Sequence, residues 1–135
     1  MSLRPLAVAV VVATGVFAGF TFVRYREFAT YQKMHLPPWQ RAPVSSDACL
    51  DWTLHWGTNC VGLPTLCEVH ARSLMAECLH SADRTNLCER VAAASQITSF
   101  GYQECAKRQA TEGLSKNTCA DLFRVIADFC AAAKR

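Results

Sequence analysis

The sequence lacks the short cysteine spacings on which most cysteine chemistry depends. It holds eight cysteines in 135 residues, and no two of them stand closer together than Cys60 and Cys67. Structural zinc sites usually pair cysteines about two to four residues apart, redox exchange uses Cys-x-x-Cys, and haem attachment uses Cys-x-x-Cys-His. None of these motifs occurs, nor do the adjacent Cys-Cys and Cys-x-Cys of plant-type helical carriers. We therefore expect structural disulfides, with no metal site and no cofactor.

The sequence also lacks any pattern that would carry catalysis or nucleic-acid binding. It has no glycine-rich phosphate loop, no nucleophile motif and no carboxylate pair. From Asp47 onward, nine Lys and Arg residues are balanced by ten Asp and Glu residues, so no basic excess is left for nucleic acid. The remaining candidates could bind or stack on a ligand, although such residues are more often solvated or packed: His55, His70, His80, Trp52 and Trp56. We expect no enzymatic activity, no nucleic-acid partner and no small-molecule substrate.

Charge is absent from residues 6–23. A helix over this run is about 27 Å long, enough for the hydrocarbon core of a bilayer. The alternative is a secretory signal peptide, for which Val16-Phe17-Ala18 before Gly19 would be an acceptable cleavage site. We expect a retained transmembrane anchor over residues 1–23. Within it, Gly15 and Gly19 stand on one helix face, where another membrane helix could approach closely.

Residues 24–46 form a basic neck between the anchor and the cysteines. They carry four Lys and Arg residues against one Glu, a net charge of +3. Residues 24–35 can continue the helix out of the membrane until Pro37 and Pro38 end it, because neither proline has a backbone N–H to donate. Residues 36–46 are expected to form an extended linker that lies along a partner. Lipid or a partner protein is the expected contact of Arg24, Arg26, Trp39 and Arg41.

The spacing of the cysteines is helical. Three pairs follow Cys-x10-Cys, and the fourth is Cys88-x16-Cys105. Residues eleven apart on a helix differ by about 20° after whole turns, so both sulfurs lie on one face, about three turns apart. Two such helices folded back on each other bring outer cysteine to outer and inner to inner. Antiparallel geometry thus predicts two doubly stapled hairpins, with the bonds Cys49–Cys78, Cys60–Cys67, Cys88–Cys130 and Cys105–Cys119.

Local signals place the first two helices of the domain, which covers residues 47–135. Ser45 or Ser46 is the expected N-cap of a helix of about ten residues, and Gly57 stands where a left-handed C-cap residue is expected. Thr65-Leu66-Cys67-Glu68 has the form of a capping box, which starts the next helix. The second helix then runs until residues 81–85 break the chain again.

The second hairpin contains a length mismatch. Its first helix should start at Asn86-Leu87-Cys88-Glu89, and a break near residues 99–101 would absorb the extra length of the segment that ends at Cys105. Residues 113–118 then form a turn. The last helix should bury one face made of Cys119, Leu122, Phe123, Ile126 and Cys130. The predicted fold class is all-α, with one N-terminal transmembrane helix followed by two disulfide-stapled antiparallel helical hairpins.

Paired helical segments with cysteines about ten apart resemble the coiled-coil-helix-coiled-coil-helix proteins (CHCH, twin CX9C) of the mitochondrial intermembrane space. The resemblance covers residues 49–130. Its strength lies in the repeated cysteine pattern more than in identities. Residues 112–130, especially Cys119-Ala120-Asp121-Leu122-Phe123-Arg124, are similar to a segment of the four-motif CHCH accessory subunit of respiratory complex I. The resemblance implies a structural or assembly role in inner-membrane complexes, without an active site.

The expected function is that of a non-catalytic accessory subunit stabilising a mitochondrial inner-membrane respiratory complex, with complex I first and other respiratory complexes or ATP synthase next. The alternatives are a CHCH-type assembly or cristae-organising factor, and a secreted or surface-anchored cysteine-rich binding protein. The expected partners are subunits of a large inner-membrane complex and membrane lipid such as cardiolipin.

Two rules disagree on which side of the inner membrane the domain lies. The basic neck places it in the matrix by the positive-inside rule. Eight cysteines need an oxidising compartment and place it in the intermembrane space. We expect the intermembrane space, because the hairpin spacing of eight cysteines is harder to explain otherwise than four basic residues are.

Overall fold

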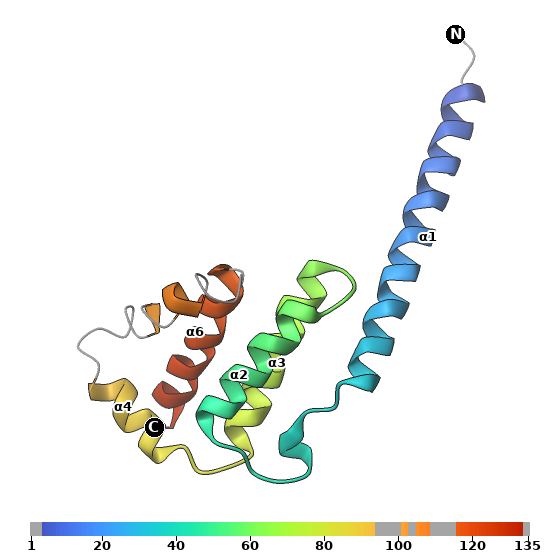
Figure 1. The fold of residues 1–135 in the computed structure, drawn as a ribbon. Helices are drawn as coiled ribbons and strands as arrows, with labels where there is room; N and C mark the ends of the chain where they lie inside the picture. The colour runs from blue at the N-terminus through green and yellow to red at the C-terminus, as the bar shows by residue number, and fades with distance from the viewer. Residues whose placement is uncertain (1–3, 94–100, 103–104, 109–115, 134–135) are drawn as a thin grey trace.

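All the regular structure in the described part of the chain is helical. The computed structural model describes residues 4–93, 101–102, 105–108 and 116–133. The elements in chain order are α1 (Arg4–Met34), the 3-10 helix η1 (Pro38–Gln40), α2 (Ser46–Asn59), α3 (Pro64–His80), α4 (Thr85–Ala93) and α6 (Lys116–Ala132). The predicted fold class is confirmed, since one apolar N-terminal helix precedes helices that four disulfides staple together (Figure 1).

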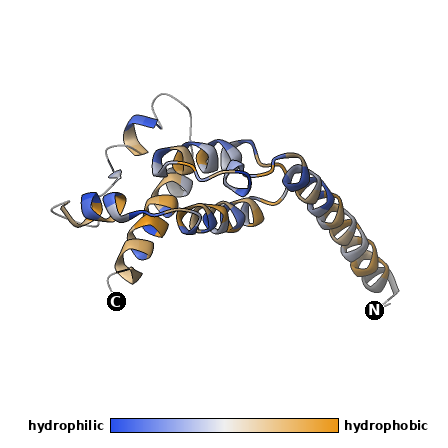
Figure 2. Ribbon diagram, turned by 90° about the horizontal axis from the view of Figure 1, so that it is seen from below, coloured by the Kyte–Doolittle hydropathy of each residue, from blue (hydrophilic) through white to orange (hydrophobic). Residues whose placement is uncertain are grey.

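The helix α1 is a rod of 31 residues, which is about 47 Å long at 1.5 Å per residue. Within the described ranges it is the one helix long and apolar enough to cross a membrane, with a mean hydropathy of 1.7 and none of its apolar window buried. Its N-terminal half rises away from the other helices (Figure 1). As expected, the helix continues without a break into residues 24–34, and Figure 2 shows polar residues replacing apolar ones as it reaches the domain.

The first hairpin consists of α2 and α3, which lie side by side. The hydroxyl of Ser45 accepts a hydrogen bond from the amide of Ala48 at 3.1 Å, so Ser45 is the N-cap of α2 as expected. However, α2 has 14 residues rather than ten, and the prediction that Gly57 is a C-cap is wrong. Gly57 lies inside the helix, where a Cβ would be 3.6 Å from the Cβ of Ala71. This is an ordinary van der Waals distance, so the packing of α3 leaves room for a methyl group at this position.

The helices α3 and α4 both start earlier than their expected capping boxes. Pro64 is the first residue of α3, and the N-cap Leu63 makes no side-chain bond. A proline suits this position because its φ is already helical and no N–H donor is needed there. The helix α4 starts at Thr85, whose amide and hydroxyl both donate to the carboxylate of Asp83, at 2.9 and 2.7 Å. Both helices thus begin with residues outside the expected motifs.

The second hairpin has a short first helix. The helix α4 ends at Ala93, and the expected break at Ser99 and Phe100 lies outside the described residues. Gly101, at the end of the expected break, has a φ of +83°, which only glycine adopts without strain. The expected turn at residues 113–115 also lies outside the described residues, whereas residues 116–118 belong to α6.

The four disulfides have the connectivity that the spacing predicts. In the first hairpin, the Cα atoms of Cys49 and Cys78 and those of Cys60 and Cys67 are 5.9 Å apart. In the second, the corresponding distances are 5.1 Å for the pair Cys88–Cys130 and 5.7 Å for the pair Cys105–Cys119. Each hairpin is therefore closed by one disulfide near its open end and one near its turn.

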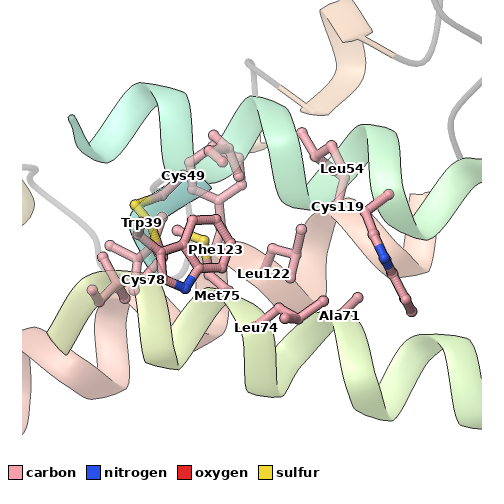
Figure 3. Packing of buried hydrophobic residues seen from close by; sticks show 14 of the residues in the cluster. Trp39, Cys49, Leu54, Ala71, Leu74, Met75, Cys78, Cys119, Leu122 and Phe123 are labelled. Carbon is pink, nitrogen blue, oxygen red and sulfur yellow. A yellow bond between two sulfur atoms is a disulfide. The ribbon is translucent and has the colours of Figure 1, made fainter. Parts of the chain in front are cut away.

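The core lies between α2, α3 and α6. The helix α6 buries the expected face, since Cys119, Leu122, Phe123, Ile126 and Cys130 are all buried. It packs more extensively against α3 than against its hairpin partner α4. Figure 3 shows Leu122 of α6 directed toward Leu74 and Met75 of α3. The described domain is thus a three-helix core to which α4 is stapled.

Candidate functional site at the junction of helix and domain

The domain end of α1 packs against α2 and α3. Phe28 and Tyr31 are only 7% and 6% exposed, whereas residues 8–20 of the same helix are exposed. The two aromatic residues stand three positions apart and so lie on one helix face. This face is where the apolar rod becomes part of the domain.

Four ring side chains form this contact, and we call them the junction cluster: Phe28, Tyr31, Trp56 and His70. The ring of Trp56 lies 6.3 Å from that of Phe28 and 5.4 Å from that of Tyr31, both edge to face. The hydroxyl of Tyr31 donates to the Trp56 carbonyl at 3.4 Å. Each aromatic pair contributes about 0.5–1.5 kcal/mol beyond its buried area. The contact is therefore specific in geometry as well as apolar.

The α2–α3 turn touches α1 at Gly62. This glycine has a φ of +137°, and a Cβ on it would lie 2.8 Å from the Cβ of Phe28 and 3.2 Å from the carbonyl oxygen of Arg24. Real side chains do not approach so closely, so a larger residue would push the turn away from the helix. Gly62 is the position at which the first hairpin and α1 are in closest backbone contact.

His70 closes the junction cluster from α3. Its ring is 5.7 Å from that of Phe28 and 5.0 Å from that of Trp56. Burial against these rings lowers the pKa of His70 below its ordinary value of 6.5, and the nearby charge of Glu77 opposes the shift. The neutral imidazole is thus favoured, and it acts here as a flat packing group.

The segment between α1 and α2 folds back onto the domain. Trp39 of η1 is 7% exposed, its indole donates to the Glu77 carboxylate at 3.1 Å, and its ring meets that of Trp52 at 4.9 Å. Trp39 was expected to contact lipid or a partner, and residues 36–46 to extend along a partner. Instead Trp39 lies in the chain's own core, because Trp52 and Glu77 offer its ring an apolar wall and its N–H an acceptor.

Arg84 ties the end of this segment to the first hairpin. The side chain is 7% exposed, and its guanidinium donates to the carbonyls of Val44 at 2.7 Å and Cys78 at 2.9 Å. It also donates to the sulfur of Cys49 at 3.3 Å. Burial lowers the pKa of Arg84, while the charge of Asp83 opposes the shift. One buried cation therefore holds the neck, the C-terminal end of α3 and the outer disulfide together.

These contacts give the site a mechanical character. In the described ranges, no group of three or more His, Cys, Asp or Glu side chains could hold a metal ion, and all eight cysteines form disulfides. What the arrangement does is to fix the direction in which α1 leaves the domain.

No protein-family model, curated protein or solved structure matches the chain.

Four of the residues expected to make outside contacts lie on the surface. A Cβ built on Gly15 or Gly19 would have no neighbour within 4 Å, so their face of α1 is open. Arg26 and Arg41 are exposed. Contacts of these residues with a membrane helix, lipid or a partner stay predictions.

The fifth such residue, Arg24, pairs with Glu27 at 3.1 Å. Among the histidines weighed as ligands, His55 is exposed beside Asn59, and His80 packs edge to face on Phe129 at 4.9 Å. The contacts of Arg84 and Glu77 could not be predicted from a local sequence pattern, because they join residues far apart along the chain. Nothing local in the sequence indicated the contact of Gly62 with α1.

Proposed function

We propose that this chain is a non-catalytic accessory subunit that braces a mitochondrial inner-membrane respiratory complex, with complex I as the first candidate. One observation carries the proposal: the apolar helix is continuous with the part that packs into a disulfide-stapled domain. A domain held this way keeps a fixed distance and direction from the membrane. A binder on a solvated tether would not need the junction cluster or Arg84.

The cysteine chemistry supports the compartment. Disulfides persist in oxidising compartments and are rare in reducing ones, and the two doubly stapled helical hairpins have the arrangement expected of the CHCH proteins that the sequence resembles. We therefore place the domain in the intermembrane space. Protease added to mitochondria with a ruptured outer membrane should remove the domain. Protection of the domain together with cleavage near the N-terminus would place it in the matrix.

The function is tested by mild detergent extraction, native electrophoresis and mass spectrometry. The chain should migrate with one large respiratory complex at fixed stoichiometry, and its depletion should lower the amount of that complex more than its turnover per copy. Migration with partly assembled complexes alone would indicate an assembly factor instead. Migration as a free small protein, with respiratory complexes unchanged on depletion, would favour the membrane-anchored binding protein and refute the proposal.

A matched pair of variants connects this test to the junction. Phe28→Ser removes a buried ring between α1 and the domain, whereas Phe17→Ser changes an exposed ring in the apolar half of the same helix. If bracing depends on the junction, Phe28→Ser lowers the amount of the complex while the disulfides still form. Loss of the complex with Phe17→Ser but not with Phe28→Ser would show that the membrane helix acts without the junction.

A further inference from the structure

A groove of about 530 Å³ opens beside the junction cluster, where α1 meets the α2–α3 turn. Its lining includes Phe22, Val23, Arg26, Glu27, Met34 and Val61. Val61 is 47% exposed at the tip of the turn, and the close approach of Gly62 to Phe28 holds it against α1. The groove is therefore built from two segments that the fold fixes relative to each other.

The charge in this groove is positive. Glu27 already accepts a hydrogen bond from Arg24 at 3.1 Å, so its carboxylate is neutralised by a residue next to the groove. Arg26 lies over the ring of Phe22 at 5.9 Å and has no carboxylate partner among the residues that the structure describes. The face thus presents one uncompensated guanidinium above apolar side chains.

The end of the groove at Phe22, Val23 and Arg26 lies at the depth of lipid headgroups. The uncharged run ends at Val23, and Arg26 follows three residues later, about 4.5 Å further along the helix. The headgroup layer on each side of a bilayer is about 5–7 Å thick. Arg26 therefore reaches the phosphate level when residues 6–23 occupy the hydrocarbon core, and Phe22 and Val23 lie at the level of the first acyl carbons.

We propose that this groove binds an anionic phospholipid of the leaflet on the domain's side. The phosphate pairs with Arg26, and the glycerol and first methylene groups lie against Phe22, Val23 and Val61. We assign a phospholipid because it is amphipathic in the same way as the groove. The groove is basic at the depth of the phosphate and apolar at the depth of the first acyl carbons. The proposal rests on the membrane anchor of the proposed function, but not on the respiratory complex.

The test is native mass spectrometry of the purified full chain in detergent, titrated with phosphatidylglycerol or phosphatidylcholine. The wild-type chain should retain phosphatidylglycerol in preference, and Arg26→Gln should weaken that retention about fivefold, the contribution of one basic residue near an anionic surface. The matched control is Arg90→Gln on the exposed face of α4, which should change nothing. Val61→Ser should weaken the retention of both lipids.

Three outcomes would overturn the proposal. The first is equal retention of both lipids by the wild-type chain, and the second is an Arg26→Gln variant that binds like wild type. The third is a photo-crosslinker at position 61 that, in native membranes, captures a protein helix and no lipid. The lipid titration contains no respiratory complex. A negative titration would therefore refute lipid binding without affecting the native-electrophoresis test, and a negative native-electrophoresis result would not affect the titration.

Discussion

The two hairpins carry the same pair of staples but differ in how they are packed. In the first, α2 and α3 have 14 and 17 residues and lie against each other along their lengths. In the second, α4 has nine residues, of which only Leu87 and Val91 are buried, and α6 packs mainly against α3. The helices α4 and α6 of the second hairpin are therefore held together more by a disulfide than by side chains buried between them.

This difference shows what the disulfides do in each place. In the first hairpin, they reinforce helices that already share a core, and Arg84 adds the neck to it. In the second, the Cys88–Cys130 bond holds α4 to α6, where α4 contributes only two buried hydrophobic side chains besides. Since α1 joins the first hairpin, the more tightly packed half of the domain is also the half that carries the long apolar helix.

The largest expected effect comes from removing the outer disulfide of the first hairpin. Cys49→Ala with Cys78→Ala opens a loop with a sequence separation of 29 and deletes two fully buried sulfurs. We expect the free energy of unfolding to fall by about 4 kcal/mol, mostly through the larger entropy of the unfolded chain. Denaturant unfolding of the oxidised chain in detergent measures this loss.

The corresponding change in the second hairpin sharpens the comparison. Cys88→Ala with Cys130→Ala opens a longer loop, with a sequence separation of 42, so loop entropy alone predicts a slightly larger loss. If α4 is held mainly by its staple, the effect is instead local. Amides of α4 should exchange rapidly with solvent, while those of α2 and α3 keep their protection. Equal loss of protection in all these helices would contradict the distinction between the two hairpins.

A smaller effect is expected from Gly101→Ala. A Cβ at this position would overlap the ring of Phe123, and the backbone φ is +83°. Overpacking and a left-handed backbone together should destabilise the domain by about 2–4 kcal/mol. Thermal unfolding followed by circular dichroism gives the shift in midpoint. An unchanged midpoint would mean that the ring of Phe123 moves aside without loss.

Gly62→Ala is the counterpart in the first hairpin. Its added Cβ would meet α1 rather than the three-helix core, and its φ of +137° is strained for alanine, so we expect a looser junction together with a modest loss of stability of about 1–2 kcal/mol from the backbone. Spin labels on the exposed faces of α1 and α3 should report a broader distance distribution in this variant. A large drop in the unfolding midpoint would show instead that α1 and the domain fold as one unit.

The sequence predicts those parts of the fold that depend on the regular spacing of cysteines and apolar residues along a helix. The disulfide connectivity of the first hairpin follows from two pairs of cysteines eleven residues apart, and the buried face of α6 follows from the spacing of Cys119, Leu122 and Ile126. The site depends on contacts that leave no local pattern. Trp39 meets Glu77 and Arg84 meets Val44 across 38 and 40 residues of sequence. For this reason Trp39 was predicted to face outward and Arg84 was overlooked.

A separate substitution tests whether Arg84 fixes the neck to the first hairpin. Arg84→Met keeps an unbranched apolar stem but removes the guanidinium, which leaves the carbonyl of Val44 without its donor, whereas the carbonyl of Cys78 keeps the hydroxyl of Ser81 at 2.7 Å. An orphaned buried acceptor costs about 1–3 kcal/mol, so we expect a loss of about 2 kcal/mol, with faster hydrogen exchange in residues 42–46. The control is Arg72→Met, an exposed arginine on α3, which should change the stability little. Equal losses in the two variants would show that the neck is held by other contacts.

The smallest effect is a pH dependence located at the junction. Because the pKa of His70 is lower in the folded chain than its ordinary value of 6.5, the unfolded chain binds more protons as the pH falls through 6.5. The contribution of His70 to stability is therefore fully present above pH 6.5 and is lost as the pH falls toward the folded pKa. Asp83, whose pKa is lowered by hydrogen bonds from Thr85, acts in a separate window below its ordinary value of 3.8.

Denaturant unfolding at a series of pH values between about 7.5 and 5 isolates this contribution. Wild-type stability should decline across that range, and His70→Gln should flatten the decline because glutamine takes up no proton. His55→Gln removes an exposed imidazole on α2 and should leave the wild-type slope in place.

Because protonation of His70 would place a charge against Phe28 and Trp56, spin-label distances between α1 and α3 should broaden as the pH falls, while those between α4 and α6 stay constant. If the second hairpin loosens first, or if His70→Gln keeps the full slope, the pH dependence does not arise at the junction.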